Sequence, residues 1–205
     1  MGLNKIMIEY ELNYYRQEWV YTKFINNKNL MLDWPRRMGK STYSITCILD
    51  YALNNPNTTH LITGHDVGAN RLLLQKMVMC NFERMSSPIV ETVLDNKVIF
   101  KNQSVIYFGS KSTNGKIKLD TLFVDELGEF GENKNEFFSV IHHNPNIKLL
   151  VNCTDFTSMF FDQSRRLFSK YQIPLYVDYY KTDEEVMFIL RRKKIEKIKT
   201  ISGGF

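Results

Sequence analysis

The sequence predicts an α/β fold in which a mainly parallel sheet is flanked by helices, with an antiparallel β-meander inserted. Short apolar runs alternate along the chain with longer segments of helical periodicity, a pattern typical of parallel sheets covered on both faces. A Gly-Lys-Ser sequence joins the first apolar run to a helix, and two adjacent carboxylates end a later run. Three β-prone runs follow one another without a helix, which indicates the meander.

The elements follow in order from these patterns. We expect helices over 12–25, 41–53, 67–84, 135–142 and 162–170. We expect strands over 30–33, 60–63, 120–125, 147–152 and 175–178, with the meander at 89–94, 97–101 and 104–108. Asn54-Asn55-Pro56-Asn57 ends the second helix, because Asn and Pro favour turns over helix.

The chain divides into one domain over 1–180 and a basic helical tail over 181–205. Thr182-Asp183-Glu184-Glu185 is a capping box that opens the tail helix. The tail carries six cations between 191 and 199. A solvated helix face explains such a run, and a docking surface for DNA or another domain is the functional alternative.

Trp34-Pro35-Arg36-Arg37-Met38-Gly39-Lys40-Ser41-Thr42 has the character of a phosphate-binding loop between a strand and a helix. Such a loop directs backbone N–H groups and the positive end of the helix dipole at phosphate. Gly39 would allow close approach, Lys40 would reach the β- and γ-phosphates, and Ser41 would bind Mg²⁺. We expect the nucleotide, ATP, to be bound by Arg37, Met38, Gly39, Lys40, Ser41 and Thr42. The first glycine of the motif is replaced by Trp34, so a basic turn is the alternative.

Thr121-Leu122-Phe123-Val124-Asp125-Glu126 is an apolar strand that ends in two carboxylates. Asp125 is in the position to hold Mg²⁺ with Ser41, and Glu126 is the candidate to deprotonate the attacking water. The alternative is a strand followed by a polar loop. Because this strand follows the loop in the required order, we expect a P-loop NTPase of the RecA/ASCE type.

Composition excludes several other classes of protein. Of 205 residues, 43% are hydrophobic and 24% charged, which is ordinary for a globular protein, and no apolar run is long enough to span a membrane. Cys47, Cys80 and Cys153 are widely spaced and predict buried free thiols. The net charge of +5 is compatible with a polyanionic partner.

These motifs resemble the ATPase domain of the large terminase subunit of tailed bacteriophages, the motor that pumps double-stranded DNA into proheads. Arg36 to Ser41 is similar to that family's variant loop, with Arg37 in place of a glutamine. The resemblance implies that Gln17, in Tyr15-Arg16-Gln17, reads adenine, that Thr154 senses the γ-phosphate, and that Arg36 assists catalysis with Lys40 and Glu126. It also implies a homo-oligomeric ring on a portal, a small terminase subunit or separate nuclease as partner, and work in the host cytoplasm.

The chain departs from that family in two ways. The family continues into an RNase-H-like nuclease domain for which this chain has no room, so we expect no nuclease activity. Its trans-acting arginine is missing from 112–116, so Lys116, Arg71 or Arg84 would have to serve. Three other functions remain open: a helicase-like ATPase, a signalling or defence ATPase, and a non-hydrolysing assembly protein.

Overall fold

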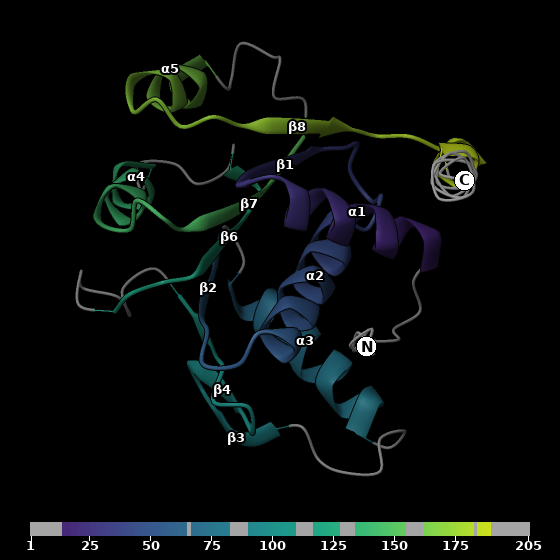
Figure 1. Cartoon of the computed structure of the whole chain (residues 1–205), viewed down its shortest axis with the longest axis vertical. Coiled ribbons are helices and arrows are strands. Elements are labelled where there is room, and N and C mark those ends of the chain that lie inside the picture. The colour runs from purple at the N-terminus through teal and green to yellow at the C-terminus, as the bar shows by residue number, and fades with distance from the viewer. Residues whose placement is uncertain are drawn as a thin grey trace, which may run out of the picture.

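The structure is a computed structural model that describes residues 14–64, 67–82, 90–109, 117–127, 134–154, 162–182 and 184–189. It contains an eight-stranded sheet with helices on both faces (Figure 1). The strands are β1 (Asn29–Asp33), β2 (Thr59–Gly64), β3 (Val90–Leu94), β4 (Lys97–Phe100), β5 (Val105–Phe108), β6 (Thr121–Asp125), β7 (Lys148–Cys153) and β8 (Tyr176–Tyr179). The helices are α1 (Tyr14–Asn26), α2 (Lys40–Asn54), α3 (Val67–Phe82), α4 (Lys134–His143) and α5 (Asp162–Lys170).

The order of the strands is β3-β4-β5-β2-β6-β7-β1-β8. In this spatial order, every pair of neighbouring strands between β5 and β8 is parallel. The pairs β3 with β4 and β4 with β5 are antiparallel. The predicted parallel sheet and meander are therefore both confirmed. The meander joins the main sheet through β5, which lies parallel to β2.

Each face of the sheet carries its own hydrophobic core. Leu32, Ile62 and Phe123 point toward α1, α2 and α3, while Met31, Leu61 and Val124 belong to the core with α4 and α5. Buried strands covered on both faces read as continuous apolar runs, which is why the sequence revealed them. Figure 1 shows α1 to α3 on one side of the sheet and α4 and α5 on the other.

The predicted elements agree with the structure to within about two residues at the ends that are described. The capping box is confirmed, since the Thr182 amide donates to Glu185 Oε2 at 2.7 Å and the Glu185 amide donates to Thr182 Oγ1 at 3.3 Å. Residues 184–189 are helical, and the expectation for 190–205 lies outside the described residues. Cys47 and Cys153 are buried free thiols as expected, and the side chain of Cys80 is not described.

The register brings the expected functional groups to one edge. Asp33 lies beside Cys153, and Gly64 beside Asp125. β7 separates β1 from β6, so the segments after these three parallel strands leave the sheet together. Among the described residues no helix is long and apolar enough to cross a membrane.

Candidate nucleotide-binding site

The loop between β1 and α2 has the backbone of an anion-binding turn. Arg37 and Gly39 both have a left-handed conformation, with φ of 64° and 74°, and alternating conformations of this kind form concave nests of N–H groups. Gly39 caps α2 without a side-chain hydrogen bond, so the helix start is served by backbone alone. A Cβ at Gly39 would also lie 3.3 Å from the Tyr43 ring.

The Lys40 side chain turns back over the loop. Its ammonium donates to the carbonyls of Trp34 at 2.9 Å and Pro35 at 3.2 Å, and to Thr154 Oγ1 at 2.9 Å. Glu126 Oε1 lies 3.4 Å away. Lys40 is only 4% exposed, so these contacts replace water around a buried cation, as burial of a charge requires.

A chain of hydrogen bonds joins α2, β6 and β7 beneath the loop. Ser41 Oγ donates to Asp125 Oδ1 at 2.9 Å, and the Asn152 amide donates to the same oxygen at 2.7 Å. Asn152 Oδ1 accepts from Ser44 Oγ at 2.7 Å. Asn152 and Ser44 are fully buried, and Asp125 is 8% exposed. The two expected metal-binding residues, Ser41 and Asp125, are thus in direct contact.

These two residues fit Mg²⁺. The hydroxyl and the carboxylate are oxygen donors 2.9 Å apart, and protein-bound Mg²⁺ uses one or two such ligands with substrate phosphates and water. The described residues contain no group of three or more His, Cys, Asp or Glu that would cage a metal. A site completed by the substrate agrees with that donor set.

Glu126 stands at the end of β6 in a left-handed backbone conformation, with φ of 50°. Non-glycine residues in this region are uncommon and concentrate at functional sites. The Thr154 hydroxyl lies 3.4 Å from Glu126 Oε2 and accepts from Lys40. The structure therefore brings the predicted site residues Lys40, Glu126 and Thr154 into mutual contact.

The other expected site residues lie at different depths. Arg36, Arg37 and Met38 are exposed at the turn of the loop, and Thr42 is half-buried on α2. Gln17 is buried on α1, where its amide donates to Asp50 Oδ2 at 3.1 Å. Asp50 follows Lys40 by ten residues on α2, about 15 Å along a helix axis. This contact does not bring Gln17 to the loop, and its role toward adenine remains a prediction.

Three structural features of the site were not expected from the sequence. Asn152 donates to Asp125, although the sequence singled out only Thr154, two residues later, as a site residue. Gly64 lies so close to Asp125 that a Cβ there would meet the Asp125 carbonyl oxygen at 2.5 Å. Trp34 is 1% exposed and is anchored by its side chain. A polar residue within a buried strand was the available signal for Asn152, since such groups need partners.

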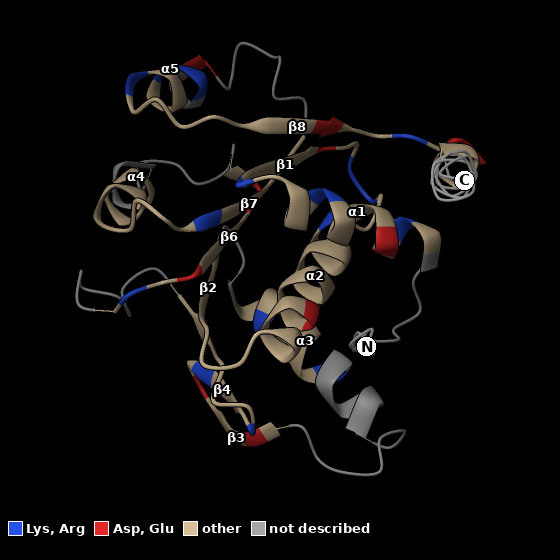
Figure 2. Ribbon diagram, viewed as in Figure 1, with Lys and Arg blue, Asp and Glu red and all other residues tan. Residues whose placement is uncertain are grey.

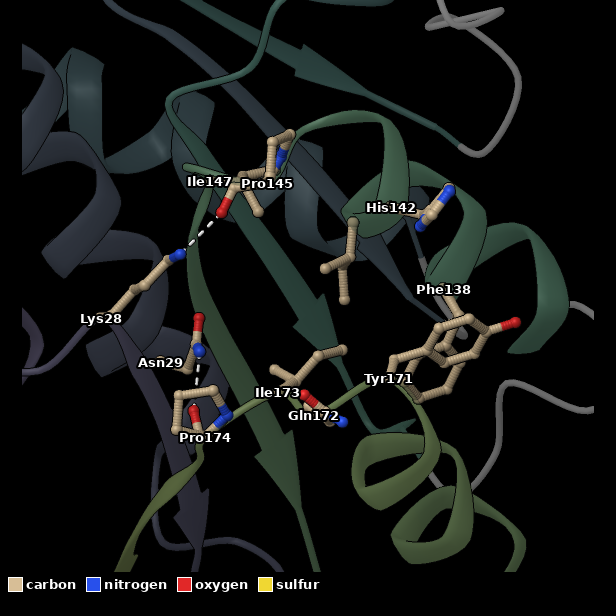
Figure 3. A pocket seen from close by; sticks show the side chains of 11 residues that line it. Lys28, Asn29, Phe138, His142, Pro145, Ile147, Tyr171, Gln172, Ile173 and Pro174 are labelled. Atoms are coloured by element: carbon tan, nitrogen blue, oxygen red, sulfur yellow. Dashed lines mark hydrogen bonds between the residues drawn. The ribbon is translucent and has the colours of Figure 1, made fainter.

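A described pocket lies elsewhere, at the end of the sheet where β1, β7 and β8 begin. It measures about 190 Å³ and is bounded by α4 and by the segments before β1, β7 and β8. Two of its polar side chains are hydrogen-bonded to backbone, since Lys28 donates to the Pro145 carbonyl and Asn29 to that of Pro174 (Figure 3). The Arg71 guanidinium, a candidate for the trans arginine, donates to the Asp95 carbonyl between β3 and β4.

No known family profile matches this sequence, and no curated protein matches it. Solved structures do match its fold. The large terminase of a thermophilic bacteriophage has a TM-score of 0.59 at 19% identity, over 82% of this chain and 45% of that one. That terminase has also been solved with ATP-γ-S and with ADP. The chain thus spans less than half of that terminase.

A second match is the ATPase domain of the Thermus phage P74-26 large terminase, with a TM-score of 0.58 at 13% identity, over 94% of this chain and 90% of that one. The SWI2/SNF2 ATPase core of Sulfolobus solfataricus, solved with double-stranded DNA, matches with a TM-score of 0.51 at 11% identity, over 90% of this chain and 48% of that one. The fold of this chain is accordingly that of the ATPase domains of large terminases.

Proposed function

We propose that this chain is the ATP-hydrolysing domain of a motor that translocates double-stranded viral DNA into a prohead. The observation that carries the proposal is the convergence of Ser41 with Asp125 and of Lys40 with Glu126 at one edge of the sheet. The fold shared with large-terminase ATPase domains supports it. Nucleotide binding is further supported by the complexes of the thermophilic phage terminase with ATP-γ-S and ADP.

The geometry suggests how these residues would act on ATP. The Lys40 ammonium would exchange its longer contact, with the Pro35 carbonyl, for β- and γ-phosphate oxygens. Glu126 would accept a proton from the attacking water. The water oxygen would then bond to the terminal phosphorus as the bond to the ADP oxygen breaks, which releases phosphate and ADP. Ser41 and Asp125 would hold Mg²⁺, which supplies neutralisation of phosphate charge when bound. Arg36 would add a second cation from the exposed turn.

Thr154 would connect hydrolysis to movement. Its hydroxyl contacts both Lys40 and Glu126, so loss of the γ-phosphate would change its partners. Along the chain, Thr154 is followed after seven residues by α5. α5 is thus the next described element along the chain to which a displacement of Thr154 could pass.

We further propose that α5 contacts DNA. Arg166 and Lys170 are exposed on this helix one turn apart, and Figure 2 shows cationic segments along α5. Arg165 is paired with Asp162 within the helix. The DNA complex of the SWI2/SNF2 core, which shares this fold, supports double-stranded DNA as the partner. Assembly as a ring on a portal, with a separate nuclease or small terminase subunit, belongs to the same proposal.

Steady-state ATP hydrolysis tests the function. Wild type, Lys40→Ala, Glu126→Gln and the control Glu18→Gln, a half-buried carboxylate of α1, are compared with double-stranded DNA, single-stranded DNA, RNA or no nucleic acid. We expect hydrolysis to be lost in the first two variants, ATP binding to survive in Glu126→Gln, and double-stranded DNA to stimulate the wild type. Hydrolysis that persists in both Lys40→Ala and Glu126→Gln would refute the assignment of these residues to the active site. Stimulation by RNA or single strands alone would favour a helicase-like ATPase.

A further inference from the structure

The residue that replaces the first glycine of the phosphate loop is held by three elements. The Trp34 indole donates to Asp178 Oδ2 on β8 at 3.2 Å. Its amide donates to the Cys153 carbonyl on β7 at 3.3 Å, and its ring meets Tyr43 of α2 edge-on with 5.9 Å between centroids. The indole hydrogen bond and the ring contact restrain the start of the loop, and a glycine at this position would make neither and would leave the backbone freer.

Asp178 is the centre of this arrangement. It is 2% exposed and lies beside Leu32 in the pairing of β8 with β1. It also accepts from the Trp19 indole of α1, at 3.3 Å to each oxygen. A buried carboxylate needs such donors. The two indoles are the only tryptophans in the chain, and both donate to this one group.

A second set of contacts, made by Arg16, packs against the face of the Trp34 indole. The Arg16 guanidinium lies over the Trp34 ring at 5.2 Å and over the Tyr180 ring at 4.7 Å, distances at which cation–π attraction operates. Arg16 also donates to the Lys181 carbonyl at 2.7 Å. The edge strand β8 therefore contacts Trp34 directly, through Asp178. The residues just after β8 contact it indirectly, through Arg16 of α1.

The consequence for the site runs through the Trp34 backbone, because its carbonyl oxygen accepts the hydrogen bond from the Lys40 ammonium. We propose that Asp178 is a positioning residue of the phosphate loop: by accepting the Trp34 indole N–H, it fixes the carbonyl that holds Lys40 ready for phosphate. This inference rests on the proposed function for its effect on ATP. The restraint of the loop by Asp178 is a property of the nucleotide-free protein and can be measured without ATP.

The two tryptophans offer a matched comparison. Trp34→Phe and Trp19→Phe each remove one indole N–H from Asp178, but only Trp34 belongs to the loop. Asp178→Asn keeps the size of the side chain and one acceptor oxygen. Amide hydrogen exchange, followed without nucleotide, is measured at the backbone amide of position 34 in every variant and at Tyr43, whose N–H bonds to the Gly39 carbonyl. The Asn55 amide, bonded to the Tyr51 carbonyl at the far end of α2, is the internal control.

We expect exchange at positions 34 and 43 to accelerate about tenfold in Asp178→Asn and Trp34→Phe, as loss of a hydrogen bond to a charged group implies. Exchange at Asn55 should stay constant, and Trp19→Phe should match the wild type. If the wild type binds ATP, the Kd for ATP should be about tenfold higher in Asp178→Asn than in the wild type, with a smaller change in kcat. In Trp19→Phe, where Trp34 is the sole tryptophan, adding Asp178→Asn should red-shift the emission as water reaches the indole.

Equal acceleration in Trp19→Phe and Trp34→Phe would overturn the inference, because Asp178 would then serve packing alone. Wild-type exchange in Asp178→Asn would overturn it too. Should Asp178→Asn fail to fold, the comparison of the two tryptophan variants decides. A wild type that does not bind ATP would refute the proposed function, whereas the exchange rates would still test the restraint of the loop.

Discussion

The side-chain amide of Asn152 donates a hydrogen bond of 2.7 Å to Asp125 Oδ1, the same oxygen that accepts from Ser41. Asn152 is fully buried on β7, the strand that lies between those ending in the phosphate loop and in Asp125. Its carbonyl oxygen is in turn fixed by Ser44. The orientation of the Asp125 carboxylate is therefore set from the neighbouring strand and from α2.

Asn152→Leu should weaken Mg²⁺ dependence without removing any proposed ligand. Residues that orient a metal ligand typically contribute roughly 10- to 100-fold in metal affinity. We expect the Mg²⁺ concentration for half-maximal ATP hydrolysis to rise about tenfold. Asn54→Ala, which removes an amide bonded to the Asp50 carbonyl, is the matched control and should leave it unchanged. An unaltered Mg²⁺ titration in Asn152→Leu would contradict the role of the hydrogen bond.

Gly64→Ala should lower the stability of the fold beside Asp125. A Cβ at this position would meet the Asp125 carbonyl oxygen at 2.5 Å and the Asp125 Cβ at 2.9 Å, and φ is 150°. Strain and overpacking together predict a loss of about 2–4 kcal/mol in the free energy of unfolding. Gly109→Ala is the control, because φ there is 117° but nothing lies within 4 Å. Urea unfolding should show a clearly smaller loss for Gly109→Ala, and equal losses would refute the argument.

Much of this fold could be predicted because the parallel strands are buried on both faces. Runs such as Thr121–Asp125 stand out from their surroundings, and Gly39 and Lys40 mark the loop. The sequence could not show which side chains meet across the sheet. Asn152 and Asp125 are 27 positions apart, and Trp34 and Asp178 are 144 apart. Their pairing depends on strand order and register, which local periodicity does not determine.

His60 predicts a pH dependence of stability. Burial lowers its pKa to about 3, while its ring nitrogens lie 2.7 Å from Thr121 Oγ1 and 2.8 Å from Thr58 Oγ1. The unfolded chain binds the proton near pH 6.5 and the folded chain only near pH 3. The stabilisation by neutral His60 is thus complete above about pH 6.5 and is lost as the pH falls below it.

Comparison of wild type with His60→Gln isolates this contribution, since the other titrating groups are common to both proteins. Between about pH 6.5 and 5, the wild type should lose about 2 kcal/mol more in its free energy of unfolding than the variant. Urea denaturation at pH 7.5, 6 and 5 measures the difference. Parallel pH profiles would contradict the prediction, because they would mean that His60 has the same pKa in the folded and unfolded chains.

Arg166→Ala with Lys170→Ala tests the proposed DNA contact on α5. Each phosphate contact that is lost should lower the slope of log Kobs against log salt by about 1, because fewer counterions are released on binding. We expect weaker binding to double-stranded DNA of any sequence, a slope smaller by about 2, and an unchanged Kd for ATP. These two side chains are exposed, and α5 lies on the other side of the sheet from α2 (Figure 1), so the ATP site should not respond to them.

The matched control for α5 is Lys76→Ala with Lys101→Ala. Both lysines are exposed, one on α3 and one in the turn after β4, so this pair removes the same net charge from another part of the molecule. An equal loss of DNA affinity in the control would mean that overall charge, and not α5, attracts DNA. An unchanged salt slope in the α5 variant would place the DNA contact on another surface. Because Arg166 and Lys170 follow Thr154 along the chain, a defect in DNA-stimulated hydrolysis with normal basal hydrolysis would further link α5 to coupling.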